Sequence, residues 1–380
     1  QTRKNPTFMK VSISRNSLQT ALQNLAKATP TRSTIPILSS VLFSAKEGVL
    51  EMRTTDLEIT LVTKAEASIE SPGGIAIPHR TITEITNAMP ETDITIEAEE
   101  KNRVVIRTSF GNYDISGSPP EDFPAMPEVD NKKEIKVAPA TLKRLIEKTS
   151  FALSADELKP ALMGGLFEVL KDQITAVATD GHRLSICSRS DFSSKGYEGS
   201  VIVPKKFLHL LLPYLSGEEE AVLWVGENHL TISFKETTIF SRVIDERYPD
   251  YKTVLPKENT KVLKAEREEM LASVRRVSIF SNRATRQVEL KLSKSGAVIT
   301  TEDAESASSA QEKIAVEYEG DDLTLGFNAN YLVDVLSHIS TDNVVMRLNT
   351  PISATLVEPE KQGDNEENTM LLMPMRTGGE

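Results

Sequence analysis

Apolar and polar residues alternate in many short stretches of this chain, and a period of two predicts β-strands. Clear examples are residues 94–98 and 344–348. Elsewhere apolar residues recur every three or four positions, as Leu18, Leu22 and Leu25 do, which predicts amphipathic helices. The pattern therefore predicts a protein that mixes strands and helices.

The predicted helices fall into two sets that repeat along the sequence. One set comprises residues 14–29, 138–154 and 266–281, which start 124 and 128 residues apart. The other set begins at Pro78, Pro204 and Asn328, which lie 126 and 124 residues apart. A spacing that recurs in both sets indicates one design written three times.

A third match supports the repeat, because a stretch that starts at Thr55 matches one that starts at Thr179, again 124 residues later. Each copy combines two helices with roughly eight strands, which predicts an α+β fold whose helices cover one face of a sheet. Proline-rich stretches at 119–127 and 248–256 separate the copies. We expect three domains, at residues 9–130, 131–257 and 258–376.

The composition is that of an ordinary folded protein. Hydrophobic residues make up 39% of the 380 residues and charged residues 26%, which is enough apolar material for packed cores. No apolar run approaches the ~18 residues of a membrane span. The single cysteine, Cys187, allows no internal disulfide, which favours a reducing cytoplasm. Residues 1–8 lack the apolar core of a secretory signal, so we expect the protein to start at Met9.

The net charge of −11 argues against nucleic acid as a partner only if the charge is evenly spread. The six predicted helical stretches together carry +5, which leaves −16 for the rest of the chain. Among the basic residues of these stretches are Arg15, Lys143, Arg144, Lys148, Lys205 and Lys206. One interpretation is that they form solvated helix faces. The other is that repeated domains close a ring with the helices inward, which would hold a polyanion such as duplex DNA without reading its sequence.

Four stretches resemble the bacterial DNA sliding clamps, the β subunits of DNA polymerase III. They are Ala-Thr-Asp-Gly-His-Arg-Leu at 178–184, Tyr-Pro-Asp-Tyr at 248–251, Gly-Phe-Asn at 326–328 and Met-Pro-Met-Arg at 373–376. The resemblance extends from about Met9 to Arg376.

The resemblance implies a processivity factor and not an enzyme. Two three-domain chains would join head to tail into a homodimeric ring of pseudo-sixfold symmetry, with the helices inside around double-stranded DNA. It further implies that the protein binds the catalytic subunit of DNA polymerase III, a clamp loader, other polymerases and repair proteins. It implies no association with a membrane. Neither a cofactor nor a metal is expected, and the ATPase would belong to the loader, which agrees with the absence of a Gly-x-x-x-x-Gly-Lys stretch here.

The resemblance also implies a pocket for partner peptides between the second and third domains. Its expected residues are Leu162, Thr179, Gly181, His182, Arg183, Leu184, Pro249, Val254, Asn328, Tyr331, Ile352, Leu371, Leu372, Met373, Pro374, Met375 and Arg376. Apolar walls with a few polar groups would hold a short extended peptide. Methionine side chains can repack around different partners.

Two further surfaces follow from the resemblance. The expected DNA-contacting residues are Arg32, Arg80, Lys143, Arg144, Lys205 and Lys206. The expected subunit interface pairs the 110–115 edge, with Phe110 and Tyr113, against Ile279, Phe280 and the strand after Thr300. Residues 302–309 carry few acids, which predicts a dimer with fewer interface salt bridges.

Two other functions remain open from the residues alone. Asp180 and His182 could form an acid/base pair of a hydrolase, although a tight turn explains the same residues. A repeat-built adaptor that binds proteins and never DNA is the other alternative. Thr253, Thr285 and Ala354 differ from the family's usual pocket, so peptide preference is expected to differ. The sequence assigns no role to the acidic stretch 359–368.

Overall fold

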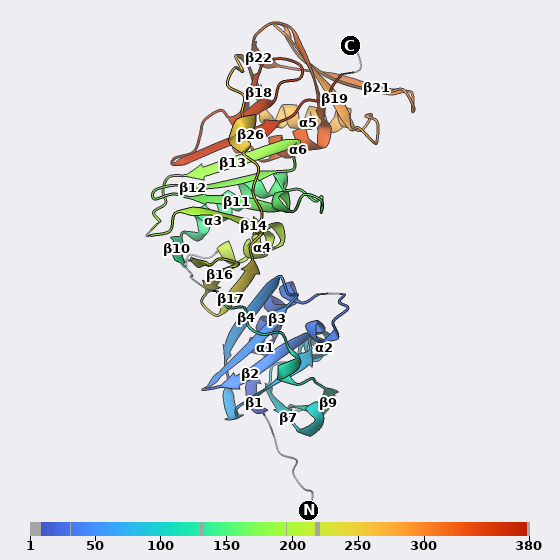
Figure 1. Ribbon diagram of the computed structural model, residues 1–380. Helices are drawn as coiled ribbons and strands as arrows, with labels where there is room; N and C mark the ends of the chain where they lie inside the picture. The colour runs from blue at the N-terminus through green and yellow to red at the C-terminus, as the bar shows by residue number, and fades with distance from the viewer. Residues whose placement is uncertain (1–8, 31, 130–132, 195, 217–220, 378–380) are drawn as a thin grey trace, which may run out of the picture. The chain divides into compact units, whose positions relative to one another are not determined.

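The computed structural model describes residues 9–30, 32–129, 133–194, 196–216 and 221–377 (Figure 1). Strand β1 begins at Met9, and residues 1–8 lie outside the described residues. The helices are α1 (Arg15–Leu25), α2 (His79–Ala88), α3 (Pro139–Thr149), α4 (Lys205–Leu211), α5 (Arg267–Ser278) and α6 (Ala329–Ser337). Each lies within one of the six predicted helical stretches, which confirms the periodicity argument.

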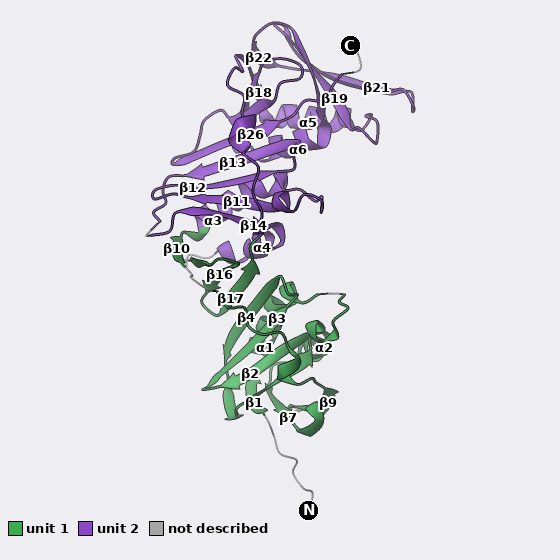
Figure 2. Ribbon diagram, viewed as in Figure 1, with its two compact units in different colours: residues 1–139, 217–243 green, residues 140–216, 244–380 purple. Residues whose placement is uncertain are grey.

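The chain forms two compact units, one of residues 1–139 and 217–243, the other of 140–216 and 244–380 (Figure 2). The first unit holds a five-stranded sheet in the order β5-β1-β7-β8-β9 and an eight-stranded sheet in the order β10-β15-β16-β17-β4-β3-β2-β6. The strands are β1 (Met9–Ser14), β2 (Ser40–Lys46), β3 (Val49–Thr55), β4 (Ile59–Glu66), β5 (Ser68–Ser71), β6 (Gly73–Pro78), β7 (Asp93–Ala98), β8 (Arg103–Arg107), β9 (Asn112–Ser116), β10 (Lys133–Val137), β15 (Ala221–Val225), β16 (His229–Phe234) and β17 (Thr237–Arg242).

The second unit holds a nine-stranded sheet in the order β14-β11-β12-β13-β26-β25-β24-β18-β22 and a four-stranded sheet in the order β21-β20-β19-β23. The strands are β11 (Gly164–Val169), β12 (Ile174–Thr179), β13 (Arg183–Arg189), β14 (Gly199–Pro204), β18 (Lys261–Glu266), β19 (Gln287–Ser293), β20 (Gly296–Asp303), β21 (Ser308–Ile314), β22 (Val316–Glu319), β23 (Leu323–Asn328), β24 (Asn343–Leu348), β25 (Thr355–Pro359) and β26 (Glu366–Leu372).

Both large sheets join strands from different copies of the repeat. In the first unit β17 pairs with β4, and in the second β13 pairs with β26 in antiparallel register, Arg183 opposite Leu372. Because hydrogen-bonded sheets run across the boundaries between copies, the chain folds into two compact units although its sequence repeats three times. The second of these pairings brings the 178–184 motif next to the C-terminal motif.

The repeated positions have equivalent structural roles. Pro78, Pro204 and Asn328, which the sequence aligns, are the N-cap residues of α2, α4 and α6. Ser14 caps α1 and accepts a hydrogen bond from the Ser17 amide, and the Glu266 carboxylate caps α5. A side-chain oxygen at this position satisfies an amide that the helix leaves unpaired. The repeat therefore fixes where each helix starts.

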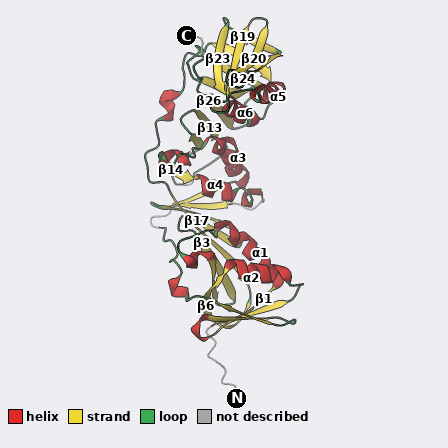
Figure 3. Ribbon diagram, turned by 90° about the vertical axis from the view of Figure 1, so that its right-hand side faces the viewer, coloured by secondary structure: helices red, strands yellow, loops and turns green. Residues whose placement is uncertain are grey.

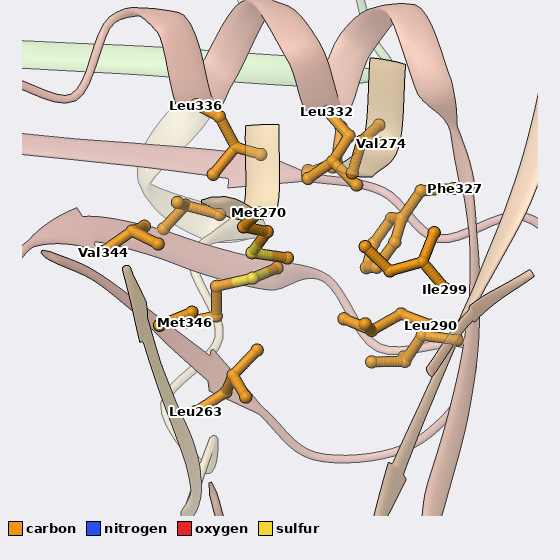
Figure 4. Packing of buried hydrophobic residues seen from close by; sticks show 14 of the residues in the cluster. Leu263, Met270, Val274, Leu290, Ile299, Phe327, Leu332, Leu336, Val344 and Met346 are labelled. Atoms are coloured by element: carbon orange, nitrogen blue, oxygen red, sulfur yellow. The ribbon is translucent and has the colours of Figure 1, made fainter. Parts of the chain in front are cut away.

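Helices and sheets enclose apolar cores. Helices α1 and α2 pack together in the first unit, and α5 and α6 pack together in the second (Figure 3). In the core beneath α5 and α6, Met270 of α5 and Met346 of β24 point toward one another (Figure 4), and both are fully buried. Flexible thioether side chains fill such irregular space between a helix and a sheet. This core holds the site-bearing helix α6 on its sheet.

Candidate functional site

The turn between β12 and β13 is built by its own side chains. The Asp180 carboxylate accepts hydrogen bonds from the amides of His182 (2.9 Å) and Arg183 (3.0 Å), and Thr179 Oγ1 accepts from the Gly181 amide (3.1 Å). Gly181 has a φ of +93°, a conformation that favours glycine. These bonds make a rigid loop that presents the His182 side chain to solvent.

The matching turn of the first copy has the same construction. Asp56 accepts from the amides of Glu58 (3.0 Å) and Ile59 (2.7 Å), and Thr55 Oγ1 accepts from the Leu57 amide (3.0 Å). Leu57 takes the left-handed conformation there, with a φ of 77°. The motif is therefore a turn that both copies share, which supports the turn interpretation of Asp180 over the acid/base pair.

Arg183 is the most constrained side chain of the site and is only 9% exposed. Its guanidinium donates to Asp180 Oδ2 (3.1 Å) and to the Phe151 carbonyl (2.8 Å), and it forms an ion pair with Asp334. The same group lies over the Tyr331 ring at 4.7 Å from its centre. Burial, followed by the neighbouring carboxylates, raises the pKa of Tyr331. Arg183 therefore ties the turn to α6.

The C-terminal motif joins this turn through backbone hydrogen bonds. The Met373 amide donates to the His182 carbonyl (2.9 Å), and the Met375 amide donates to the Gly326 carbonyl (2.7 Å). A side chain at Gly326 would place a Cβ 2.7 Å from the Met375 carbonyl oxygen, so this approach needs glycine. The Met373 side chain is 39% exposed beside the turn.

The stretch 248–255 crosses the outer face of the nine-stranded sheet and forms another side of the site. The Tyr251 hydroxyl donates to Glu168 Oε2 (2.6 Å), and the Tyr251 ring packs in a cluster with Leu184 and Leu371. Burial, and then the adjacent Glu168 carboxylate, raise the pKa of Tyr251, so the hydroxyl remains a donor. The short 3-10 helix Tyr251–Val254 leaves the Val254 side chain 53% exposed.

The remaining expected pocket residues differ in how they are placed. Asn328 accepts from the amides of Asn330 and Tyr331 at the start of α6, so its side chain is a helix cap. Leu162 is buried, and Ile352 is 70% exposed. Leu372 is fully buried in the core under α5 and α6, on the opposite sheet face from Leu371, so its side chain is not available to a ligand.

A buried ion network lies beside these elements, and no sequence pattern predicted it. Glu366, in the acidic stretch without an assigned role, accepts two hydrogen bonds from Arg144 (2.8 and 2.9 Å) and one from Arg189 (3.0 Å). Burial alone raises the pKa of a carboxyl, but the two arginines outweigh it and hold the pKa of Glu366 below its usual value. The Arg144 charge is thus balanced inside the protein.

Lys148 is not on a solvated helix face. It is 6% exposed and donates a hydrogen bond to the His338 carbonyl. Burial, with a further contribution from Arg144, lowers the pKa of Lys148 to about 8. The sequence expectation of an exposed basic helix is wrong for this residue, because α3 packs this side of itself against the stretch that follows α6.

The other candidate DNA residues are accessible within their own units. Arg32 is exposed in a loop, and Arg80 is exposed and paired with Glu84 at 2.8 Å. Lys143 lies 3.9 Å from Glu147 on α3. Lys205 is partly exposed and Lys206 exposed at the start of α4. Exposed pairs of this kind are weak and can rearrange around phosphate.

The candidate subunit interface consists of sheet edges. Strand β9 is the last strand of its sheet, with Phe110 60% exposed just before it and Tyr113 partly buried within it. In the second unit β21 is an edge strand, and Ile279 and Phe280, after α5, are 74% and 44% exposed. Free edges flanked by exposed apolar side chains are suited to pairing with another chain.

The described part of the chain gives little support for an acid/base pair or a metal site. Both Asp180 oxygens accept hydrogen bonds, one from turn amides and the other from Arg183. None of these bonds comes from the His182 ring. Among the described residues no group of three or more His, Cys, Asp or Glu could hold a metal ion. No helix within them is long and apolar enough to span a membrane.

Sequence models of one family match nearly the whole chain. The DNA polymerase III beta subunit N-terminal domain matches residues 9–127, the central domain 136–250 and the C-terminal domain 252–376. A curated relative, the beta sliding clamp of Pseudomonas aeruginosa, is 33% identical over 372 residues, which cover 97% of this chain and 100% of the relative.

Solved structures agree. The crystal structure of the DNA polymerase III subunit beta from Pseudomonas aeruginosa is similar with a TM-score of 0.92 and 32% identity. A sliding clamp from the same organism bound to griselimycin is similar with a TM-score of 0.88 and 33% identity. Each covers 97% of this chain and 100% of its own.

Proposed function

This chain belongs to the family of DNA polymerase III beta subunits, the bacterial DNA sliding clamps, and from that membership we propose which of its residues form the subunit interface, contact DNA and bind partner proteins. The family is a non-catalytic processivity factor of DNA replication. The chain is accordingly a DNA sliding clamp with an α+β fold.

We propose that two copies form a closed head-to-tail ring around duplex DNA in the cytoplasm, with domains at 9–130, 131–257 and 258–376. The proposed interface joins β9 of one copy to β21 of the other, with Phe110, Tyr113, Ile279 and Phe280 at the contact. Sedimentation tests it: Ile279→Asp should shift the dimer to monomer, whereas Leu170→Asp, at another exposed apolar residue, should not. A monomeric wild-type chain at micromolar concentration would contradict the ring.

We propose that duplex DNA passes the helix surfaces that carry Arg80, Lys143, Lys205 and Lys206, and that Arg32, on an exposed loop of the first unit, also contacts it. Arg144 supports this surface through its bonds to Glu366. Contacts of this kind are sequence-independent and weaken with salt. Lys205→Glu should reduce binding of short linear duplex at low salt, and the difference should vanish at high salt. Lys294→Glu, on an exposed hairpin, is the matched control.

The ring itself is tested by topology. After loading with a clamp loader and ATP, the clamp should remain on circular plasmid and be lost when the plasmid is linearised. An ordinary DNA-binding protein would be retained equally on both forms.

We propose that partner proteins dock in a pocket formed by the 179–184 turn, the 248–255 stretch, Tyr331 and the 371–376 segment. One observation carries this proposal: the Met373 amide donates to the His182 carbonyl, which joins the 371–376 segment to the 179–184 turn although they are distant in sequence. Tyr331 stacks on His182, and Tyr251 of the 248–255 stretch packs in a cluster with Leu184 and Leu371. Exposed Val254 and Met373 offer apolar walls, while the exposed turn supplies polar groups. The polymerase catalytic subunit, a clamp loader, other polymerases and repair proteins would compete for this pocket.

Griselimycin is a suitable probe, since a structure of the related Pseudomonas aeruginosa clamp contains it. We expect it to bind this chain, and Met373→Ala to weaken that binding by about tenfold, as expected for loss of an apolar anchor. Val49→Ala, at an exposed apolar residue of the first unit, should leave it unchanged. Equal affinities of the Met373→Ala variant and the wild type would count against the pocket.

A further inference from the structure

Five flat side-chain groups form a continuous stack beneath the proposed pocket. The His338 and Phe151 rings lie 4.0 Å apart with 16° between their planes. The Arg183 guanidinium lies 5.5 Å from the centre of the Phe151 ring and 4.7 Å from that of Tyr331. Tyr331 in turn stacks on His182 at 5.8 Å and 19°. The stack runs from His338, at the end of α6, to the exposed His182 side chain.

The inner end of the stack is anchored on both sides. The Lys148 ammonium donates to the His338 carbonyl, and the His338 ring nitrogen Nδ1 lies 2.7 Å from the Asp334 carbonyl. Because a carbonyl only accepts, this contact requires the imidazole proton on Nδ1. The ring of His338 is thereby held at a fixed angle against Phe151.

The middle of the stack is fixed as firmly. The Phe151 carbonyl and the carboxylates of Asp180 and Asp334 all accept from the Arg183 guanidinium, which is therefore held in one plane. Contact with the aromatic faces of Phe151 and Tyr331 stabilises the guanidinium further. A shift of that plane would alter the contact that Tyr331 makes with Arg183.

The stack draws its members from two parts of the chain. Phe151, His182 and Arg183 belong to the segment matched by the central-domain model, and Tyr331 and His338 to the segment matched by the C-terminal one. Order along the stack is His338, Phe151, Arg183, Tyr331, His182. The two segments interleave, so a shift of one against the other would break several contacts at once.

We propose that Phe151 and His338 are positioning residues for ligand recognition at the pocket, although neither is part of the proposed binding set. They hold the guanidinium plane of Arg183, and through it the Tyr331 and His182 rings, in the orientation that receives a partner peptide. The inference rests on the proposed pocket and adds to it a supporting layer that reaches back to α3.

The test distinguishes the effect of the flat ring from the effect of side-chain volume at Phe151 and at His338. Phe151→Leu and His338→Leu keep a side chain of similar size but remove the flat face, whereas Phe151→Tyr and His338→Phe keep a ring, the latter without the bond to the Asp334 carbonyl. Binding of griselimycin to the full-length chain by surface plasmon resonance should be weakened about three- to tenfold by the two leucine variants. The ring-preserving variants should stay within about twofold of wild type.

A second readout distinguishes positioning from general destabilisation. The chain has five histidines, so spectra of selectively ¹³C-labelled histidine can follow His182 without ligand. Its signal should move in both leucine variants and stay near the wild-type position in the ring-preserving ones. Glu366→Gln, which changes a residue bonded to Arg144 and Arg189 and not to any member of the stack, serves as the stability control: it should lower the melting temperature while leaving griselimycin affinity and the His182 signal unchanged.

The outcomes distinguish the inference from the pocket on which it rests. Failure of the wild type to bind griselimycin, or no effect of Met373→Ala, would reject the pocket itself. If the wild type binds and Met373→Ala weakens binding, but both leucine variants match wild type, the positioning role is overturned. It is also overturned if Phe151→Tyr and His338→Phe lose as much affinity as the leucine variants. Should Phe151→Leu fail to fold, the two His338 variants decide the matter alone.

Discussion

Replacing Glu366 by glutamine should measurably destabilise the second unit. The Glu366 side chain is 5% exposed, and Arg144 and Arg189 bind both of its oxygens. Removing one partner of a fully buried ion pair costs about 3–5 kcal/mol. Here the Arg144 and Arg189 side chains are 35% and 19% exposed, so water can solvate them once their partner is gone. Glutamine also keeps one oxygen acceptor, so we expect a loss of about 1–3 kcal/mol.

The melting temperature should fall correspondingly. At about 2–4 °C per kcal/mol for a unit of this size, the expected decrease at pH 7 is roughly 2–12 °C. Glu367→Gln is the matched control, because Glu367 is the next residue along β26 and is exposed. It should change the melting temperature by less than about 2 °C.

The pH dependence gives a further check with a defined sign. The two arginines hold the pKa of Glu366 below its usual value. Its stabilisation is therefore complete above the unfolded pKa of about 4.3 and is lost as the pH falls through the lower folded pKa. The difference between wild type and Glu366→Gln should be constant from pH 6 to 8 and should shrink below about pH 4. Scanning calorimetry across this range tests both statements. Equal melting at pH 7, or a difference that grows in acid, would refute the reasoning.

Three other substitutions test neighbouring parts of the site. Tyr251→Phe removes the hydroxyl that bonds Glu168 and should weaken griselimycin binding about two- to fivefold by loosening the turn that carries Val254, as calorimetric titration would show. Gly326→Ala should displace the C-terminal segment, since its Cβ would meet the Met375 carbonyl at 2.7 Å; we expect a loss of griselimycin affinity while cooperative melting persists. Lys148→Met should flatten the alkaline stability profile. The folded pKa of Lys148 is about 8, so between pH 8 and its unfolded value the unfolded chain binds more protons and wild-type stability rises with pH. Urea unfolding at pH 7.5 and 9.5 measures that rise, which the variant should lack.

The amino-acid sequence by itself determined the local structure of this protein. Period and spacing predicted six helices, and the aligned Pro78, Pro204 and Asn328 are indeed the residues that cap the second helix of each copy. The Asp180 turn was also predictable, because its hydrogen bonds connect residues two or three positions apart. Helix caps and turns depend on residues that are close in sequence, and in a repeated sequence the same local pattern occurs more than once.

Tertiary structure alone decided which side chains meet. Arg144 and Glu366 are 222 positions apart, and nothing near either residue marks them as partners. Lys148 belongs to a predicted basic helix yet is buried, since the packing of α3 and not its period selects the covered face. Alternation in β26 shows that Leu371 and Leu372 face opposite ways, but only the sheet shows which of them lies in the core. Phe151 and His338 carry no motif, and their place in the stack depends on the close packing of distant segments, which no local pattern specifies.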